Sequence, residues 1–168
     1  MEGKGAQRVG ASEAEQHSAF EKIRSGDLTG EIYVARDMAH KKLVELIDNN
    51  KLLPFDIKNK IIFYAGPCPN PPNKVIGSIG PTTAERMDKY AVKLYEKGLF
   101  ATIGKGTRSK EINDYLTLNN KKYFSMQGGI AAMLADKVKK CEIIAFPELG
   151  AEAIYKIYVE KFPIKTEI

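Results

Sequence analysis

Three short segments of the chain carry the side chains most suited to chemistry, and these are cations and hydroxyls. The segments are "ARD" (35–37), "GPTTAERMD" (80–88) and "IGKG" (103–106). Each comes after an apolar run typical of a β-strand, and ligands of open α/β sheets bind beyond the carboxyl ends of strands. Together the segments offer two arginines, one lysine and two threonines, and these groups suit a small substrate with two negative charges, such as a dicarboxylate. The candidate residues are Arg36, Thr82, Thr83, Arg86 and Lys105.

Thr82 and Arg86 also have simpler structural interpretations. Thr82-x-x-Glu85 matches a capping box, in which both side chains bond free N–H groups of a helix start. The same helix start presents unpaired N–H groups and a positive dipole end, which favour an anion. Arg86 either clamps that anion or pairs with Glu85 or Asp88 as an exposed helix arginine. The sequence leaves both interpretations open.

The remaining candidates are similarly ambiguous. We expect Asp37 to cap the helix that begins there, which is the usual role of an aspartate at that position. Arg36 is less usual, because a cation at a helix N-terminus opposes the dipole and is best tolerated beside an anion. We expect His40 to be structural. Lys105 lies between two glycines, where the backbone either approaches a ligand closely or forms an exposed turn.

Several kinds of site are excluded. No carboxylate pair or Ser-His-Asp arrangement supplies an obvious general acid or base. The segment "GKGT" (104–107) is not a Walker A motif, because the glycine that the motif requires five residues before Gly104 is missing. The two cysteines, Cys68 and Cys141, make no disulfide framework and are too few for an iron–sulfur cluster, which normally needs three or four thiolates. The sequence therefore predicts an incomplete site that holds no metal by itself.

Composition indicates the general class of protein. The chain has 168 residues, 43% of them hydrophobic, which suits one domain. Its net charge is +5, but the lysines are spread among acids, so we expect no nucleic-acid binding. No apolar run reaches the roughly 20 residues of a membrane span. We expect a cytoplasmic protein without membrane contact, with a mobile tail over 1–20 and a single domain over 21–168.

Hydrophobic periodicity predicts strands and helices in alternation, and hence an α/β sheet that is at least partly parallel. Proline-rich residues 67–81 predict a long, stiff loop, and residues 151–163 are ambiguous but alternate more like a strand than a helix. The predicted strands are 30–35, 60–66, 99–106, 122–126 and 141–146, the last of them of the buried type. The predicted helices are 36–50, 83–97, 109–120 and 128–138.

Five segments together resemble a known family. They are, in order, "GEIYVARDMAHKKL", "IIFYAGPCPNPPNKVIGSIGPTTAERMDKY", "ATIGKGTRSKEI", "GGIAAMLADKVKK" and "AFPELGAEAIYKIYVEKFP". In this order they resemble the β subunit, or fused C-terminal domain, of class I iron–sulfur hydro-lyases, namely fumarate hydratase and L-tartrate dehydratase. The resemblance covers residues 26–164.

The resemblance implies a fold and an activity. The fold would be a swivelling β/β/α domain of the fumarase β-subunit type, with mixed sheets flanked by helices, rather than a Rossmann sheet. The activity would be reversible hydration of fumarate to (S)-malate at a [4Fe-4S] cluster that a separate α subunit holds. The chain would then be inactive without its α partner, which agrees with its two cysteines. Self-association of the β chains stays open.

The resemblance also assigns roles to residues. By position in the matching motifs, Arg36 and Arg86 resemble carboxylate clamps, and Lys105 resembles an active-site lysine. Thr82 and Thr83 resemble substrate-contacting threonines, one of which transfers a proton, and the sequence does not say which.

Two positions depart from the family pattern. Glu85 stands where a small residue is expected and would repel a dicarboxylate unless it points away. Cys68 stands where threonine is common, and we expect no cluster role for it.

Two alternative functions stay open at this stage. No residue of the chain separates fumarate hydratase from L(+)-tartrate dehydratase. A different class of function is a swivelling domain that binds a small anion without catalysis.

Overall fold

The computed structural model describes residues 23, 24 and 26–168, and within them the chain forms one mixed sheet flanked by helices. The predicted tail over 1–20 lies outside these residues. The helices are α2 (Asp37–Asp48), α3 (Asp88–Glu96), α4 (Lys110–Leu118) and α5 (Ala131–Lys137), and the 3-10 helices are η1 (Ala84–Met87) and η2 (Pro147–Glu152). The strands are β1 (Ile23–Arg24), β2 (Asp27–Val34), β3 (Ile61–Phe63), β4 (Ala101–Lys105), β5 (Lys122–Met126), β6 (Val138–Ala145), β7 (Ile154–Pro163) and β8 (Lys165–Thr166).

The sheet combines a parallel centre with antiparallel flanks. Its described strands run in the order β6-β7-β2-β3-β4-β5-β8, with β1 paired to β2 outside this path. The four strands β2, β3, β4 and β5 are mutually parallel, whereas β1, β7, β6 and β8 join antiparallel. This arrangement confirms the predicted α/β class with a mixed sheet. It also brings the carboxyl ends of β2, β3 and β4 to one edge.

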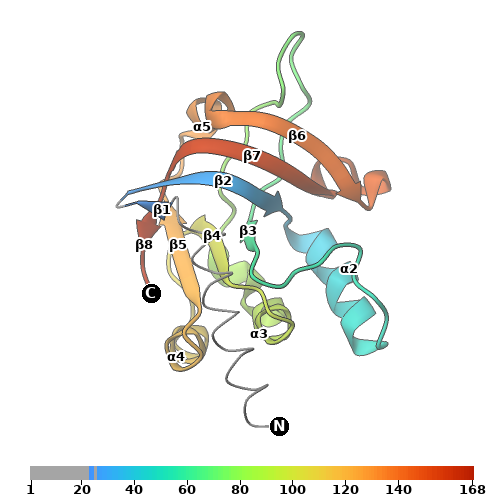
Figure 1. Cartoon of the computed structure of the whole chain (residues 1–168), viewed down its shortest axis with the longest axis vertical. Helices are drawn as coiled ribbons and strands as arrows, with labels where there is room; N and C mark the ends of the chain where they lie inside the picture. Colours follow the sequence, from blue (N-terminus) through green and yellow to red (C-terminus); the bar gives the residue numbers. More distant parts are fainter. Residues whose placement is uncertain (1–22, 25) are drawn as a thin grey trace, which may run out of the picture.

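Two hydrophobic clusters cover opposite faces of the sheet. Alternate side chains of a strand point to opposite faces, so Ile61 and Phe63 join one cluster while Ile62 and Tyr64 join the other. The first cluster includes Leu134 of α5, and the second includes residues of α2, α3 and α4. Figure 1 shows β6, β7 and β2 arching together across the molecule, with α2, α3 and α4 grouped below them. The central strands are thus covered on both faces, as a parallel centre requires.

Most predicted elements are confirmed, including the strand over the ambiguous residues 151–163, which is β7. Two predictions are wrong in part. The helix predicted over 83–97 begins as the 3-10 turn η1 and becomes α-helical only at Asp88. The strand predicted as buried over 141–146 belongs to β6, which among the described strands pairs with β7 alone and leaves Ile143 50% exposed.

No helix in the described part of the chain has both the length and the apolar character needed to cross a bilayer.

Candidate functional site

The three segments that the sequence singles out meet at the carboxyl edge of the parallel strands. Backbone hydrogen bonds hold them there, because the Thr82 amide donates to the Tyr64 carbonyl at 2.6 Å and the Lys105 amide donates to the Thr82 carbonyl at 2.9 Å. Thr83 and Lys105 form an isolated parallel bridge. The segment before η1 therefore lies between the ends of β3 and β4 like a short extra strand. This position brings Thr82 and Thr83 beside Lys105.

The capping box is not formed. The residue that precedes η1 is Thr83 instead of Thr82, and its side chain makes no capping hydrogen bond. Thr82 is used differently, because both its amide and its carbonyl are bonded to neighbouring strand ends. Its residue is only 9% exposed, whereas Thr83 and Glu85 are exposed. The two adjacent threonines thus differ: Thr82 is built into the sheet edge and Thr83 faces solvent.

Arg86 pairs with neither of the partners predicted from the sequence. Its Nε donates to Oδ1 of Asp37 at 2.9 Å and its Nη2 donates to Oδ2 at 2.8 Å. Asp37 is therefore no helix cap; the residue at the cap position of α2 is Arg36, and its side chain makes no capping hydrogen bond. Hydrogen bonding to Arg86 lowers the pKa of Asp37, and the same bonding raises the pKa of Arg86. Both groups stay ionised over the ordinary pH range.

Arg36 lies at the same edge, against a carboxylate that the sequence analysis did not single out. Oε1 of Glu152, at the end of η2, lies 3.6 Å from Nε of Arg36 and accepts a hydrogen bond from the Met38 amide at 3.1 Å. Nε of Arg36 is buried and has no hydrogen-bond partner among the described residues. Gly66 makes this approach possible, since a Cβ there would lie 2.9 Å from that Nε and 2.7 Å from the Ala151 carbonyl oxygen.

Lys105 extends past the glycines that follow β5. A Cβ at Gly128 would lie 3.2 Å from Cδ of Lys105 and 3.7 Å from its Nζ. Lys105 itself is exposed at the end of β4. Because Gly128 has no side chain, the side chain of Lys105 can lie against it, and its ammonium group stays accessible.

His40 has the structural position that we expected. It is fully buried, and its Nδ1 donates to the Arg36 carbonyl at 2.8 Å, which places the ring proton on Nδ1. Burial lowers the pKa of His40 to about 4. The neutral ring therefore supports the backbone of Arg36.

Arg108 is a buried residue that our sequence reasoning missed. Its guanidinium donates to Asp88 at 2.7 Å, to the Thr102 hydroxyl at 2.8 Å and to the Tyr64 hydroxyl at 3.0 Å. The ring centroids of Tyr64 and Tyr123 each lie 5.2 Å from its Cζ. The group ties η1 and α3 to the strands that carry the site. Its only signal in the sequence is membership of the segment "TRSKEI".

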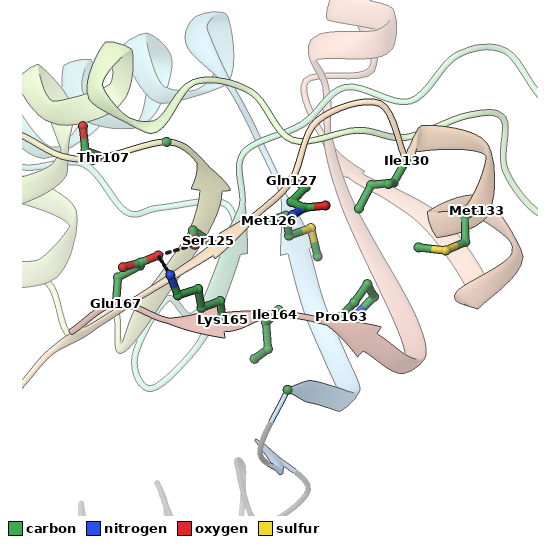
Figure 2. Close-up of a pocket in the computed structure, with 12 residues that line it drawn as sticks. Thr107, Ser125, Met126, Gln127, Ile130, Met133, Pro163, Ile164, Lys165 and Glu167 are labelled. Atoms are coloured by element: carbon green, nitrogen blue, oxygen red, sulfur yellow. Dashed lines mark hydrogen bonds and ion pairs between the residues drawn. The ribbon is translucent and has the colours of Figure 1, made fainter.

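A cavity of about 540 Å³ adjoins this edge without containing any of the five candidate residues. Figure 2 shows Met126, Ile130 and Met133 on one side of it and the ion pair of Lys165 and Glu167 on the other. It approaches the candidate site through Gly106, the residue after Lys105. The candidate residues themselves lie on an open surface, where the side chain of Arg86 is 50% exposed.

The donor set of the chain does not fit an iron–sulfur cluster. Cys68 is exposed in the proline-rich loop and Cys141 is half-buried on β6, and both are free thiols. No group of three or more His, Cys, Asp or Glu side chains within the described residues is arranged to hold a metal ion. A cluster near this site would need ligands from another polypeptide or domain.

Comparison with known proteins places this arrangement in a family. The model of the family described as "Fumarase C-terminus" matches residues 3–168. Fumarate hydratase 2 of Leishmania major is 47% identical over 139 residues, which are 81% of this chain and 24% of that protein. The anaerobic class I fumarate hydratase of Escherichia coli K12 is 49% identical over 138 residues, 81% of this chain and 25% of that protein. This chain thus spans about a quarter of the length of these relatives.

A relative whose length is closer to that of this chain is named for a different enzyme activity. The putative β subunit of L(+)-tartrate dehydratase from Methanocaldococcus jannaschii is 38% identical over 149 residues, which are 84% of this chain and 76% of that protein. The matches to both kinds of relative cover the segments that form the candidate site. The chain belongs to the fumarase C-terminus family, the C-terminal domain of class I hydro-lyases.

Proposed function

We propose that this chain is the substrate-clamping β subunit, or C-terminal domain, of a class I fumarate hydratase, which interconverts fumarate and (S)-malate. The observation that carries the proposal is the convergence of Arg36, Arg86 and Lys105 at one open sheet edge. Directed N–H groups of arginine suit carboxylates, and a dicarboxylate needs two such groups. The identity of 47–49% with fumarate hydratases favours fumarate as the substrate.

In this proposal Arg36 and Arg86 each bind one end of the dicarboxylate. Lys105, accessible beside Gly128, adds a positive charge that stabilises the carboxylate as negative charge builds up on it. Thr83 is the hydroxyl exposed toward such a substrate, whereas Thr82 is buried in the sheet edge. A threonine hydroxyl is too weakly acidic to act as a base without neighbouring cations, and Lys105 would provide one.

The rest of the site would come from a partner, the fumarase α subunit. We propose that this partner holds the [4Fe-4S] cluster and supplies the general acid or base, since this chain has two cysteines and its described residues include no group of three or more His, Cys, Asp or Glu side chains that could hold a metal ion. The open surface around Arg86 is consistent with a site that closes only in an assembly. In keeping with the family resemblance, we also propose that the domain is of the swivelling type.

L(+)-tartrate dehydratase is the second candidate function. It is favoured by the length match, because the chain covers 76% and 72% of two proteins named as β subunits of that enzyme. Their identity to this chain is lower, at 38% and 31%. Both substrates are dicarboxylates, so the same clamps serve either activity.

Anaerobic reconstitution tests the proposal. The chain would be mixed with a protein that matches the remaining three quarters of the fumarate hydratases, after cluster assembly on that protein. We expect the mixture to hydrate fumarate, which is measured as the loss of fumarate absorbance. We expect no activity from this chain alone. Turnover of L(+)-tartrate instead would select the second candidate. Full activity of the partner without this chain would refute the clamp role.

A further inference from the structure

Arg86 is held in a way that leaves one of its two hydrogen-bonding forks free. A guanidinium offers a side fork, made by Nε and Nη2, and an end fork, made by Nη1 and Nη2. Asp37 takes the side fork with both carboxylate oxygens, at 2.9 and 2.8 Å. Among the described residues, no protein atom accepts a hydrogen bond from Nη1. The end fork therefore stays available at the open sheet edge.

Asp37 is itself fixed by the residues on both sides of it. Before it, the Arg36 carbonyl accepts hydrogen bonds from the His40 amide at 2.9 Å and from His40 Nδ1 at 2.8 Å. After it, the Met38 amide donates to Glu152 at 3.1 Å. Asp37 and Arg86 are 49 positions apart in the chain and lie on different elements, α2 and η1. The backbone on both sides of Asp37 is thus held by hydrogen bonds, and its carboxylate reaches Arg86 from that fixed position.

Stability alone does not account for this pair. Both side chains are substantially exposed, at 50% for Arg86 and 34% for Asp37, and exposed ion pairs typically contribute about 0–1 kcal/mol. A bidentate contact does more for geometry, because it fixes the plane of the guanidinium as well as its position. Glu152 lies against Arg36 at the same edge, so each proposed clamp has a carboxylate behind it.

We propose that Asp37 is a positioning residue, which holds the guanidinium of Arg86 by its side fork so that the end fork meets a substrate carboxylate. This inference rests on the proposed function, in which Arg86 binds that carboxylate. The opposite role is that Asp37 competes with the substrate for Arg86. The two roles predict opposite effects when the carboxylate is removed.

The first test is Asp37→Asn in the assembled enzyme, with fumarate as substrate. The amide keeps the shape of the side chain but offers one acceptor instead of two, so the guanidinium loses its fixed plane. We expect kcat/KM to fall about 10-fold or more, mainly through kcat, because a misaligned clamp still attracts the anion but holds it poorly for reaction. An unchanged or increased kcat/KM would overturn the proposal and favour competition.

A double-mutant cycle separates positioning from a general effect on the helix. If Asp37 acts through Arg86, then Asp37→Asn should change kcat/KM little in an Arg86→Ala background. Additive losses would contradict the proposal. If Arg86→Ala alone leaves kcat/KM unchanged, the proposed function of Arg86 fails first, and that result is distinct from a failure of Asp37 alone.

Asp48→Asn is the matched control. Asp48, at the other end of α2, bonds Lys93 of α3 at 2.5 Å, and the two side chains are 51% and 46% exposed. This pair also ties α2 to the continuous segment of η1 and α3, but at the end of α2 away from the candidate site. We expect Asp48→Asn to leave kcat and KM near their wild-type values. If Asp48→Asn lowered kcat/KM as much as Asp37→Asn, the effect would come from anchoring α2 in general, and the proposal would be overturned.

A second readout needs no activity. In the chain alone, ¹⁵N NMR of the arginine side chains should show slow exchange of the Arg86 Nε–H with water, because Asp37 accepts that hydrogen. Asp37→Asn should speed this exchange several-fold, whereas Asp48→Asn should not. Equal exchange in all three proteins would overturn the proposal.

Discussion

At the scale of residues, the candidate site is suited to binding an anion through the direction of its hydrogen-bond donors more than through its net charge. Asp37 and Glu152 offset the charges of Arg86 and Arg36, which leaves Lys105 as the excess cation. A site with so little excess charge gains affinity only if the free N–H groups of its arginines point at the ligand. Small residues that determine where those arginines lie are therefore as important as the charges.

Gly66 is the residue that most directly determines where Arg36 lies. We expect Gly66→Ala to lower kcat/KM of the assembled enzyme at least 10-fold, because the new methyl group would lie 2.9 Å from Nε of Arg36 and 2.7 Å from the Ala151 carbonyl oxygen. Overpacking of this kind typically costs about 1–3 kcal/mol, which urea denaturation of the chain would detect.

Gly80→Ala provides the comparison for stability. The added methyl group there would meet Cβ of Ala131 at 3.1 Å and no backbone atom nearer than 3.8 Å. We expect a smaller loss of unfolding free energy than for Gly66→Ala. Equal losses would mean that the effect comes from replacing glycine as such and not from contact with Arg36.

At the scale of elements, η1 is the segment whose position decides whether a site exists. It carries Arg86 and follows directly on Thr83, and it is held to the strands by the buried group of Arg108 and Asp88. Ser109, at the start of α4, adds a bond from its amide to the second oxygen of Asp88 at 2.8 Å. Arg108 thus links α3, β4 and Tyr64, the residue that follows β3.

We expect Arg108→Met to lower the unfolding free energy by about 3–5 kcal/mol, since the change leaves the carboxylate of Asp88, only 12% exposed, without its charge partner. Urea denaturation measures this loss. Adding Asp88→Asn to Arg108→Met should recover part of it, because the unpaired charge is then gone.

Lys110→Met is the matched control for Arg108→Met. Lys110 forms an ion pair with Asp114 at 2.6 Å, but its side chain is 88% exposed, so we expect Lys110→Met to leave the unfolding free energy almost unchanged. If Arg108→Met and Lys110→Met had equal effects, the buried group would not hold η1 in place.

The elements could be predicted from the sequence more reliably than the pairs that hold them. Apolar periodicity predicts β2, α2, β4, α4 and β7, because each of these elements buries one face or both. The same periodicity does not reveal whether a strand lies at an edge, and β6 was therefore wrongly predicted as buried.

The candidate site shows the same limit. Its three segments could be predicted because strand ends meet at one edge of a parallel sheet. The partners of its arginines could not be predicted, since Asp37 lies 49 positions from Arg86 and Glu152 lies on η2, beyond β6. Local rules instead assigned Asp37 and Thr82 to helix caps, and tertiary contacts overrode both assignments.

At the scale of the whole molecule, the site is an exposed edge on a well-covered core. Both faces of the central strands are buried, so the positions of the clamps depend on the stability of the fold as a whole. One buried group makes that stability depend on pH. His40 is fully buried in neutral form under Arg36, beside the rings of Tyr64 and Tyr90.

The sign of this dependence follows from the pKa of His40, which burial lowers from 6.5 to about 4 in the folded chain. Between these values the unfolded chain binds a proton that the folded chain does not, so the unfolding free energy falls as pH falls from 6.5 to 4. The full contribution is about 3 kcal/mol, and it is complete below pH 4, where both states are protonated. Urea denaturation at pH 7, 6, 5 and 4 measures the slope.

His40→Gln should remove this part of the slope, because glutamine does not titrate and its amide can still donate to the Arg36 carbonyl. His17→Gln, which changes the other histidine of the chain, should leave the slope unchanged. A wild-type slope in the His40→Gln protein would show that carboxylates, and not His40, cause the acid sensitivity. A slope lost only with His40 would mean that mild acid destabilises the start of α2, and with it both proposed clamps.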